Sequence, residues 1–113
     1  ETHPDCIQMW SNPKFGVTQD VTIEQNRSVG PTQGLTGFNH VRDGVDDGGF
    51  DRIVIRGNYV ATIYAHAVYV NSCRNCAISD NEAVSLPGAR YPAWVRAPEC
   101  RSCTIERNRA PAK

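Results

Sequence analysis

One six-residue unit occurs four times along this chain of 113 residues and limits the folds that the chain can adopt. The unit reads apolar, any residue, Ile, polar, any residue, Asn. Its first and third positions lie on one face of a strand, because side chains alternate between the two faces. The closing Asn suits a bend that needs left-handed backbone geometry or a side-chain bond to the backbone. The four copies close at Asn26, Asn58, Asn81 and Asn108.

A second short apolar segment precedes each copy of the unit, so each repeat supplies at least two strands. These segments are residues 6–9, 34–37, 67–70 and 94–97. Prolines at seven positions interrupt every candidate amphipathic helix. The sequence therefore predicts an all-β fold, a right-handed parallel β-helix (solenoid) of about four coils. Residues 1–113 form either a single domain of this kind or a fragment of a larger β-helix.

The stacking of coils turns the repeat into predicted columns of like side chains. Neighbouring coils lie about 4.8 Å apart, so equivalent residues pack directly on one another. We expect a column of amides at one corner, formed by the closing asparagines, which satisfies polar groups along the stacking axis. We expect a core column of aliphatic side chains at Ile23, Ile55, Ile78 and Ile105.

The opening segment, residues 3–10, and the first unit, residues 20–26, resemble the right-handed β-helix repeat proteins of the pectate lyase-like superfamily. That class includes polysaccharide lyases, mannuronan epimerases and phage tailspikes. The resemblance extends over essentially the whole chain through the four Asn-terminated units, which specify fold far more than activity. It implies a polysaccharide or cell-surface glycan as the partner. It also implies a location that is extracellular or associated with a virion or cell surface.

Five cysteines include two C-x-x-C pairs, Cys73 with Cys76 and Cys100 with Cys103. Taken alone, two such pairs are typical of a four-thiolate zinc site. The repeat, however, places the second cysteine of each pair at an inward strand position, where free cysteine packs as a small apolar residue. We therefore favour stacked free thiols over zinc. An axial disulfide between equivalent cysteines of the two pairs is a further alternative.

A polar stripe is expected on the outside of the first strands. If the central apolar residue of each segment points inward, the next residue points outward. A tyrosine that stacks on a sugar ring, an arginine that pairs with a uronate and a glutamine that bonds hydroxyls are typical of a glycan-binding face. An ordinary solvated face is the alternative. The stripe consists of Gln8, Thr36, Tyr69 and Arg96, and Tyr64 and Trp94 nearby are further candidate substrate-binding residues.

Titratable residues gather just before the inward positions of the same segments. A histidine, a tyrosine and a carboxylate on adjacent coils can move a proton at the carbon next to a uronate carboxylate, while an arginine neutralises the substrate. Lyases and epimerases of the resembled class work in this way. Structural hydrogen bonding is the alternative for Asp5 and His66, and the alignment sets Ala93 level with His66. The candidate catalytic residues are His66, Tyr69, Arg96, Asp5 and His3.

The longest insertion, residues 40–49, is rich in glycine and holds three carboxylates, Asp43, Asp46 and Asp47. Carboxylate oxygens are calcium ligands, and lyases of the resembled class use that ion to hold acidic sugars. The spacing matches no EF-hand or nonapeptide repeat, so a surface turn without a cofactor is the default and Ca²⁺ the candidate metal. His40 and Arg42 are candidate substrate-binding residues, because long loops on rigid repeats often carry function.

The net charge and the lengths of the apolar runs limit the classes of partner that we expect. Basic and acidic residues number 12 each, so no net field draws the chain to nucleic acid or to an anionic membrane. No apolar run approaches the roughly 18 to 20 residues that span a bilayer. We therefore expect neither nucleic acid nor membrane as a partner.

Three functional hypotheses follow. The first is a polysaccharide-recognising module, with lyase or epimerase activity on acidic glycans left open. The second is a non-catalytic structural or adhesive module of the tailspike, fibre or surface-assembly type. Such a module would associate with itself or with other subunits through unpaired strand edges at the ends of the stack. The third, a zinc-binding module, depends on the cysteine pairs alone.

Overall fold

The structure is a computed structural model that describes residues 4–12, 14 and 16–112, apart from the side chain of Arg42. The described residues form strands and turns and no helix, which agrees with the predicted all-β class. It follows that this part of the chain contains no helix long and apolar enough to cross a membrane.

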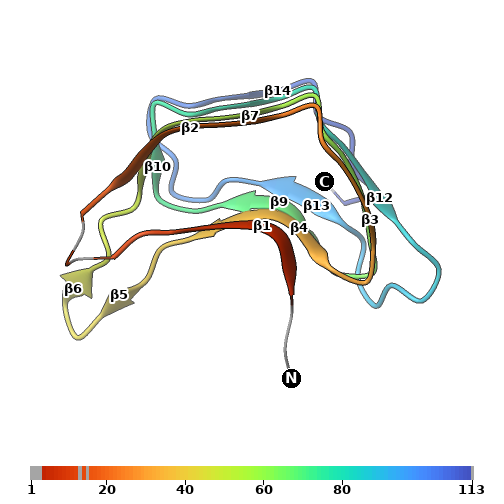
Figure 1. Ribbon diagram of the computed structural model, residues 1–113, viewed down its shortest axis with the longest axis horizontal. Coiled ribbons are helices and arrows are strands. Elements are labelled where there is room, and N and C mark those ends of the chain that lie inside the picture. Colours follow the sequence, from red (N-terminus) through yellow and green to blue (C-terminus); the bar gives the residue numbers. More distant parts are fainter. Residues whose placement is uncertain (1–3, 13, 15, 113) are drawn as a thin grey trace.

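The strands form three parallel sheets that the chain visits in turn (Figure 1). The first sheet has the order β1 (Asp5–Trp10), β4 (Gln33–Phe38), β9 (His66–Val70) and β13 (Trp94–Arg96). The second contains β2 (Thr18–Glu24), β7 (Phe50–Arg56), β10 (Cys73–Arg74), β11 (Ala77–Ser79) and β14 (Thr104–Glu106). The third has the order β3 (Arg27–Gly30), β8 (Tyr59–Thr62) and β12 (Glu82–Ser85).

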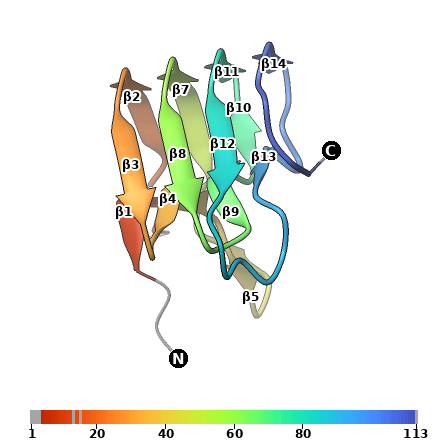
Figure 2. The same ribbon diagram turned by 90° about the vertical axis from the view of Figure 1, so that its right-hand side faces the viewer.

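We call one visit to each sheet a pass. Figure 2 shows the passes side by side, in sequence order from the red to the blue end of the chain. The second pass carries an antiparallel hairpin of β5 (Val41–Arg42) and β6 (Val45–Asp46), which projects away from the three sheets (Figure 1). This hairpin is the longest insertion recognised in the sequence.

The predicted aliphatic column is confirmed in its register, whereas the predicted burial fails at Ile105. Ile23 pairs with Ile55, Ile55 with Ile78, and Ile78 with Ile105 across β2, β7, β11 and β14. Ile23, Ile55 and Ile78 are buried, whereas Ile105 in β14 is 45% exposed. Leu35 and Val68 of the first sheet and Val60 of the third join them in one core, so the core lies between the three sheets.

The predicted amide column is also confirmed, and it bonds in a regular pattern. The Oδ1 of Asn81 accepts bonds from the backbone N (3.0 Å) and the Nδ2 (2.9 Å) of Asn58. The Nδ2 of Asn81 donates to the carbonyl of Ile55 (2.9 Å) and to the Oδ1 of Asn108 (2.9 Å). Asn26 makes the same contacts to Asn58. The amides of Asn58, Asn81 and Asn108 therefore satisfy backbone groups of the pass before them, and each side chain also bonds to the equivalent asparagine of a neighbouring pass.

The left-handed geometry expected at this corner belongs to the residue before each asparagine. Gln25, Gly57, Asp80 and Arg107 have φ values between 54° and 66°. One left-handed residue turns the chain sharply after the strand, and the following Asn fixes the bend through its side chain.

The cysteine prediction is wrong on the state of the thiols. The structure closes each C-x-x-C pair on itself, as the disulfides Cys73–Cys76 and Cys100–Cys103, and leaves Cys6 as a free, exposed thiol. Neither stacked free thiols nor an axial disulfide is formed. The inward position is nevertheless as expected, because Cys73 stacks on Phe50 and both cysteines of the first pair are buried. Packing position alone could not distinguish a thiol from a bond between cysteines three residues apart.

We expect Asn81→Ala to lower the free energy of unfolding by about 2–4 kcal/mol. The substitution leaves the Asn58 amide and the Ile55 carbonyl without their partner, and each unsatisfied buried group costs about 1–3 kcal/mol. Urea titration followed by circular dichroism measures the change. Asn12→Ala, which removes an exposed side-chain bond to the Lys14 amide, is the control. Equal stability of the two variants would contradict the role given to the column.

Exposed ion pairs between neighbouring passes make stability depend on pH. Bidentate bonds from Arg52 hold the pKa of Asp20 below its usual 3.8, and bonds from Arg107 do the same for Asp80. Because the folded-state pKa is lowered, the stabilisation is complete above 3.8 and is lost as pH falls through the lowered pKa. We expect Asp20→Asn with Asp80→Asn to lose less stability than the unaltered protein between about pH 5 and about pH 2 in urea titrations. Asn12→Ala, at an exposed position without a carboxylate, should leave the pH profile unchanged.

Candidate functional site

The first sheet presents the predicted stripe on its outer face. Gln8 pairs with Thr36, Thr36 with Tyr69, and Tyr69 with Arg96, so the predicted register is confirmed. Gln8 and Arg96 are exposed and Tyr69 is half-buried. Thr36 has no exposed surface, so a bound molecule does not reach it in this structure.

Four rings form a cluster on this outer face, which we call the aromatic cluster: Phe38, His66, Tyr69 and Trp94. The rings of His66 and Tyr69 lie 4.3 Å apart between centroids, and Phe38 lies 5.4 Å from Tyr69. His66 also meets Trp94 edge to face at 5.2 Å. The cluster spans β4, β9 and β13 and forms an apolar platform within an otherwise polar face.

Polar contacts fix the rings of the cluster in place. The Nε1–H of Trp94 donates to the Nδ1 of His66 at 2.8 Å, so this ring nitrogen acts as an acceptor. The guanidinium of Arg96 stacks on the face of Trp94, 3.8 Å from the ring centroid. The stacked Arg96 therefore brings a positive charge to the edge of the aromatic platform.

A one-residue bulge in β9 creates this arrangement. Trp94 pairs with His66 and Val95 with Val68, so Ala67 is the extra residue. Ala67 is buried, which lets His66 and Tyr69 share the outer face although three positions separate them. The alignment that set Ala93 level with His66 is wrong for this reason, since Ala93 lies buried in the core and Trp94 takes its place.

Two hollows flank the aromatic cluster. One, of about 280 Å³, lies towards the β5–β6 hairpin and is lined by Gln8, Trp10, Ser11, Asn12, Phe38, His40 and Asp47. The other, of about 420 Å³, lies towards the loop after β12 and is lined by Gln33, Ile63, Tyr64, Ala65, His66, Gly88, Arg90, Tyr91 and Trp94. In Figure 1 the hairpin and that loop project on either side of the first sheet. The outer face is thus a broad surface with a hollow at each end.

The predicted catalytic residues are only partly brought together. His66, Tyr69 and Arg96 lie on the two neighbouring strands β9 and β13. Asp5 lies in β1, and β4 separates it from β9, which places it about 10 Å away at the usual strand spacing. His3 lies outside the described residues. The expected grouping of a histidine, a tyrosine and the Asp5 carboxylate on adjacent strands is therefore not formed.

The predicted binding residues lie around the same face. Tyr64 and Trp94 line the larger hollow, and Gln8 and His40 line the smaller one. Arg42 lies in β5, and its side chain is outside the described part of the structure.

The three carboxylates proposed for calcium do not converge. Asp43 lies at the exposed turn of the hairpin, Asp46 accepts a bond from the amide of Gly48 (2.7 Å), and Asp47 lies 3.7 Å from the Nδ1 of His40. Among the described residues, no group of three or more His, Cys, Asp or Glu side chains is placed to hold a metal ion.

Comparison with protein-family models, with curated proteins and with solved structures gives no match to this chain.

Several site residues were missed from the sequence. Phe38 stands two positions after Thr36 on the same face of β4, so the two-residue period was a usable signal. Tyr91, which is 60% exposed, and Arg90 reach the larger hollow from a loop whose path no strand pattern predicts.

We expect Trp94→Phe to lower the free energy of unfolding by about 1 kcal/mol. Phenylalanine keeps a ring beneath Arg96 but removes the Nε1–H that donates to His66. Trp10→Phe is the matched control, because Trp10 is 72% exposed and should tolerate the change. Urea titration of both variants gives the comparison. If Trp94→Phe were as harmless as Trp10→Phe, the His66–Trp94 bond would not be organising the cluster.

Proposed function

We propose that this chain is a polysaccharide-binding module that holds a glycan along the outer face of its first sheet. The observation that carries the proposal is the aromatic cluster with Arg96 stacked on Trp94. Ring faces stack on the apolar faces of sugars, and polar side chains at their edges bond hydroxyl or carboxylate groups. The two hollows at either end suit an extended ligand rather than a compact one.

We also infer that the fold is a right-handed parallel β-helix of about four coils, of the pectate lyase-like kind. The support is the order in which the chain visits three parallel sheets, together with the pairing of equivalent residues from pass to pass in the second sheet. The asparagine column supports the same inference, because each amide bonds to the equivalent amide of a neighbouring pass.

Recognition is better supported than proton transfer. The Nδ1 of His66 is occupied by the indole N–H of Trp94, and Asp5 lies two strands away. Proton abstraction needs a base within about 3 Å of the carbon acid's proton, with an electrostatic partner for the developing charge. The proposal therefore assigns binding to the outer face and needs no cofactor.

An extracellular or surface location accords with this proposal. Two disulfides persist best in an oxidising compartment, and polysaccharides are most abundant outside the cell or on its surface. A non-catalytic adhesive module of the tailspike or fibre class would use the same face without turnover.

We expect Tyr69→Ala and Trp94→Ala each to weaken glycan binding about tenfold or more, because a truncated ring removes its stacking contact. The loss of a central aromatic anchor typically costs about 1 kcal/mol or more of binding free energy, and about 2 kcal/mol at a hot spot. Affinity electrophoresis in gels that contain polygalacturonate, alginate or a neutral glucan measures the effect. Tyr59→Ala, on the third sheet beneath Arg27, is the aromatic control.

Circular dichroism of each variant confirms that the fold is retained. Retardation by none of the three polymers, or equal retardation of Tyr69→Ala and the unaltered protein, would refute the proposal. Ultraviolet absorbance of the same mixtures detects unsaturated sugar, and its appearance would show that the face also catalyses elimination.

A further inference from the structure

The two C-x-x-C pairs share a feature that their disulfides do not explain. Both read Cys-Arg-x-Cys, so Arg74 and Arg101 each follow the first cysteine of a pair. Arg74 and Arg101 are joined by a parallel backbone bridge, which sets them one above the other on neighbouring passes. Since Cys73 points into the core, Arg74 beside it points outward. The motif therefore holds two arginines in one column.

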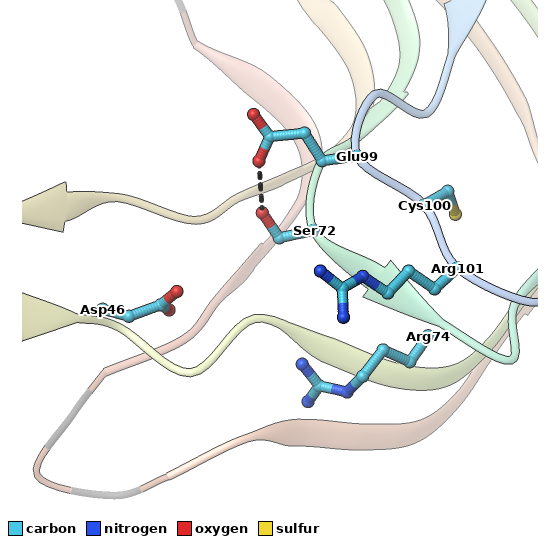
Figure 3. A pocket seen from close by; sticks show the side chains of 6 residues that line it. All are labelled: Asp46, Ser72, Arg74, Glu99, Cys100 and Arg101. Carbon is cyan, nitrogen blue, oxygen red and sulfur yellow. Dashed lines mark hydrogen bonds between the residues drawn. The ribbon is translucent and has the colours of Figure 1, made fainter.

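Both arginines line one pocket of about 510 Å³, which we call the arginine pocket. Figure 3 shows their side chains extended side by side in the same direction, with Asp46 opposite and Glu99 and Ser72 at the side. The pocket lies between the hairpin of the second pass and the turns of the later passes, away from the aromatic cluster. Its volume falls within the range of small-molecule sites.

The arginine pocket differs from three other arginine positions of the chain. Arg52, Arg56 and Arg107 each pair with a carboxylate of a neighbouring pass. Among the described residues, Arg74 and Arg101 have no carboxylate oxygen within ion-pairing distance. Like charges directly opposite each other on adjacent parallel strands repel. An anion bound between the two guanidinium groups would relieve that repulsion.

The carboxylates of the pocket have other partners. The Oε2 of Glu99 accepts a bond from the Oγ of Ser72 at 3.4 Å. Asp46 accepts from the amide of Gly48, and this bond, the Asn39 amide and the charge of Arg74 together hold the pKa of Asp46 below its usual range. Asp46 and Glu99 are thus placed as acceptors at the rim of the pocket.

Arg74 is positioned rather than free to turn away. Its Nη2 donates to the carbonyl of Gly48 at 3.1 Å, and the side chain is half-buried. The adjoining Gly49 has a φ of 71°, and a Cβ there would lie 2.5 Å from the carbonyl of Ser72. The missing side chain at Gly49 therefore lets the turn close beneath Arg74.

We propose that the two Cys-Arg-x-Cys motifs form a clamp in which Arg74 and Arg101 bind the anionic group of an acidic sugar, with Asp46, Glu99 and Ser72 facing its hydroxyl groups. Guanidinium groups bond carboxylate or sulfate oxygens in pairs, which fixes orientation as well as charge. Carboxylate acceptors beside them favour a ligand that also carries hydroxyls over a simple ion. The choice of a sugar rests on the proposed function, whereas the choice of an anion rests on the pocket alone.

Isothermal titration calorimetry with trigalacturonate, a sulfated galactose trisaccharide, the neutral galactose trisaccharide and inorganic sulfate tests the clamp. We expect one or both charged trisaccharides to bind, and the neutral one to bind at least about tenfold more weakly. Arg74→Gln and Arg101→Gln should each weaken binding of the charged trisaccharide about tenfold, and added salt should weaken it as well. Arg109→Gln, an exposed arginine outside the pocket, should bind like the unaltered protein.

Arg101→Lys keeps the charge but loses the paired bonds, so it should fall between the unaltered protein and Arg101→Gln. Perturbation of the side-chain NMR signals of Arg74 and Arg101 by the charged trisaccharide reports binding without any substitution. Equal affinity for neutral and charged sugars, binding of inorganic sulfate alone, or full binding by both glutamine variants would overturn the clamp.

Tyr69→Ala separates the two proposals. It should leave the perturbation of the Arg74 and Arg101 side-chain NMR signals by the charged trisaccharide unchanged while it weakens retention by polymers. Loss of polymer binding with an intact response to the charged trisaccharide places the failure in the outer face. The opposite pattern, in which polymers bind but the charged trisaccharide leaves the NMR signals of Arg74 and Arg101 unperturbed, overturns the clamp alone.

Discussion

Side-chain amide bonds along the stacking axis are the interaction on which the rest of the structure depends. Each strand unit ends in a left-handed residue and then an asparagine, whose amide bonds its own pass to the one before. These bonds hold the corner of each pass directly against the corner of the next pass. The register of the second sheet, and that of the first sheet outside the bulge in β9, follows from that common corner. Loops inserted elsewhere, such as the β5–β6 hairpin, do not disturb it.

The sequence was sufficient for features that repeat. The two-residue period and the spacing of the asparagines predicted the isoleucine column, the amide column and the outer stripe, because each depends on equivalent positions in successive passes. It was not sufficient for features that occur once. The extra residue at Ala67 breaks the register within β9, and no local pattern distinguishes a bulged alanine from a regular one.

The cysteines show a second feature that could not be predicted from the sequence. Their inward position followed from the repeat, but bonding within each pair depends on a tight turn with left-handed residues at Asn75 and Ser102, which only the structure reveals. The burial of Thr36 was likewise hidden, because an outward direction does not say what neighbouring side chains cover. Position along a strand was predictable, whereas chemical state and coverage were not.

The bulge at Ala67 has a consequence for how such a surface tolerates sequence change. The amide column accepts loops of different length between passes, so insertions there are absorbed without a shift in the sheets. Within β9 the bulge absorbs a single extra residue, since strict alternation through Ala67 would direct the imidazole of His66 towards the core, whereas removal of Ala67 would leave His66 and Tyr69 two positions apart on the outer face. The stack can thus gain whole loops between strands, or one bulged residue within β9, and keep its outer face.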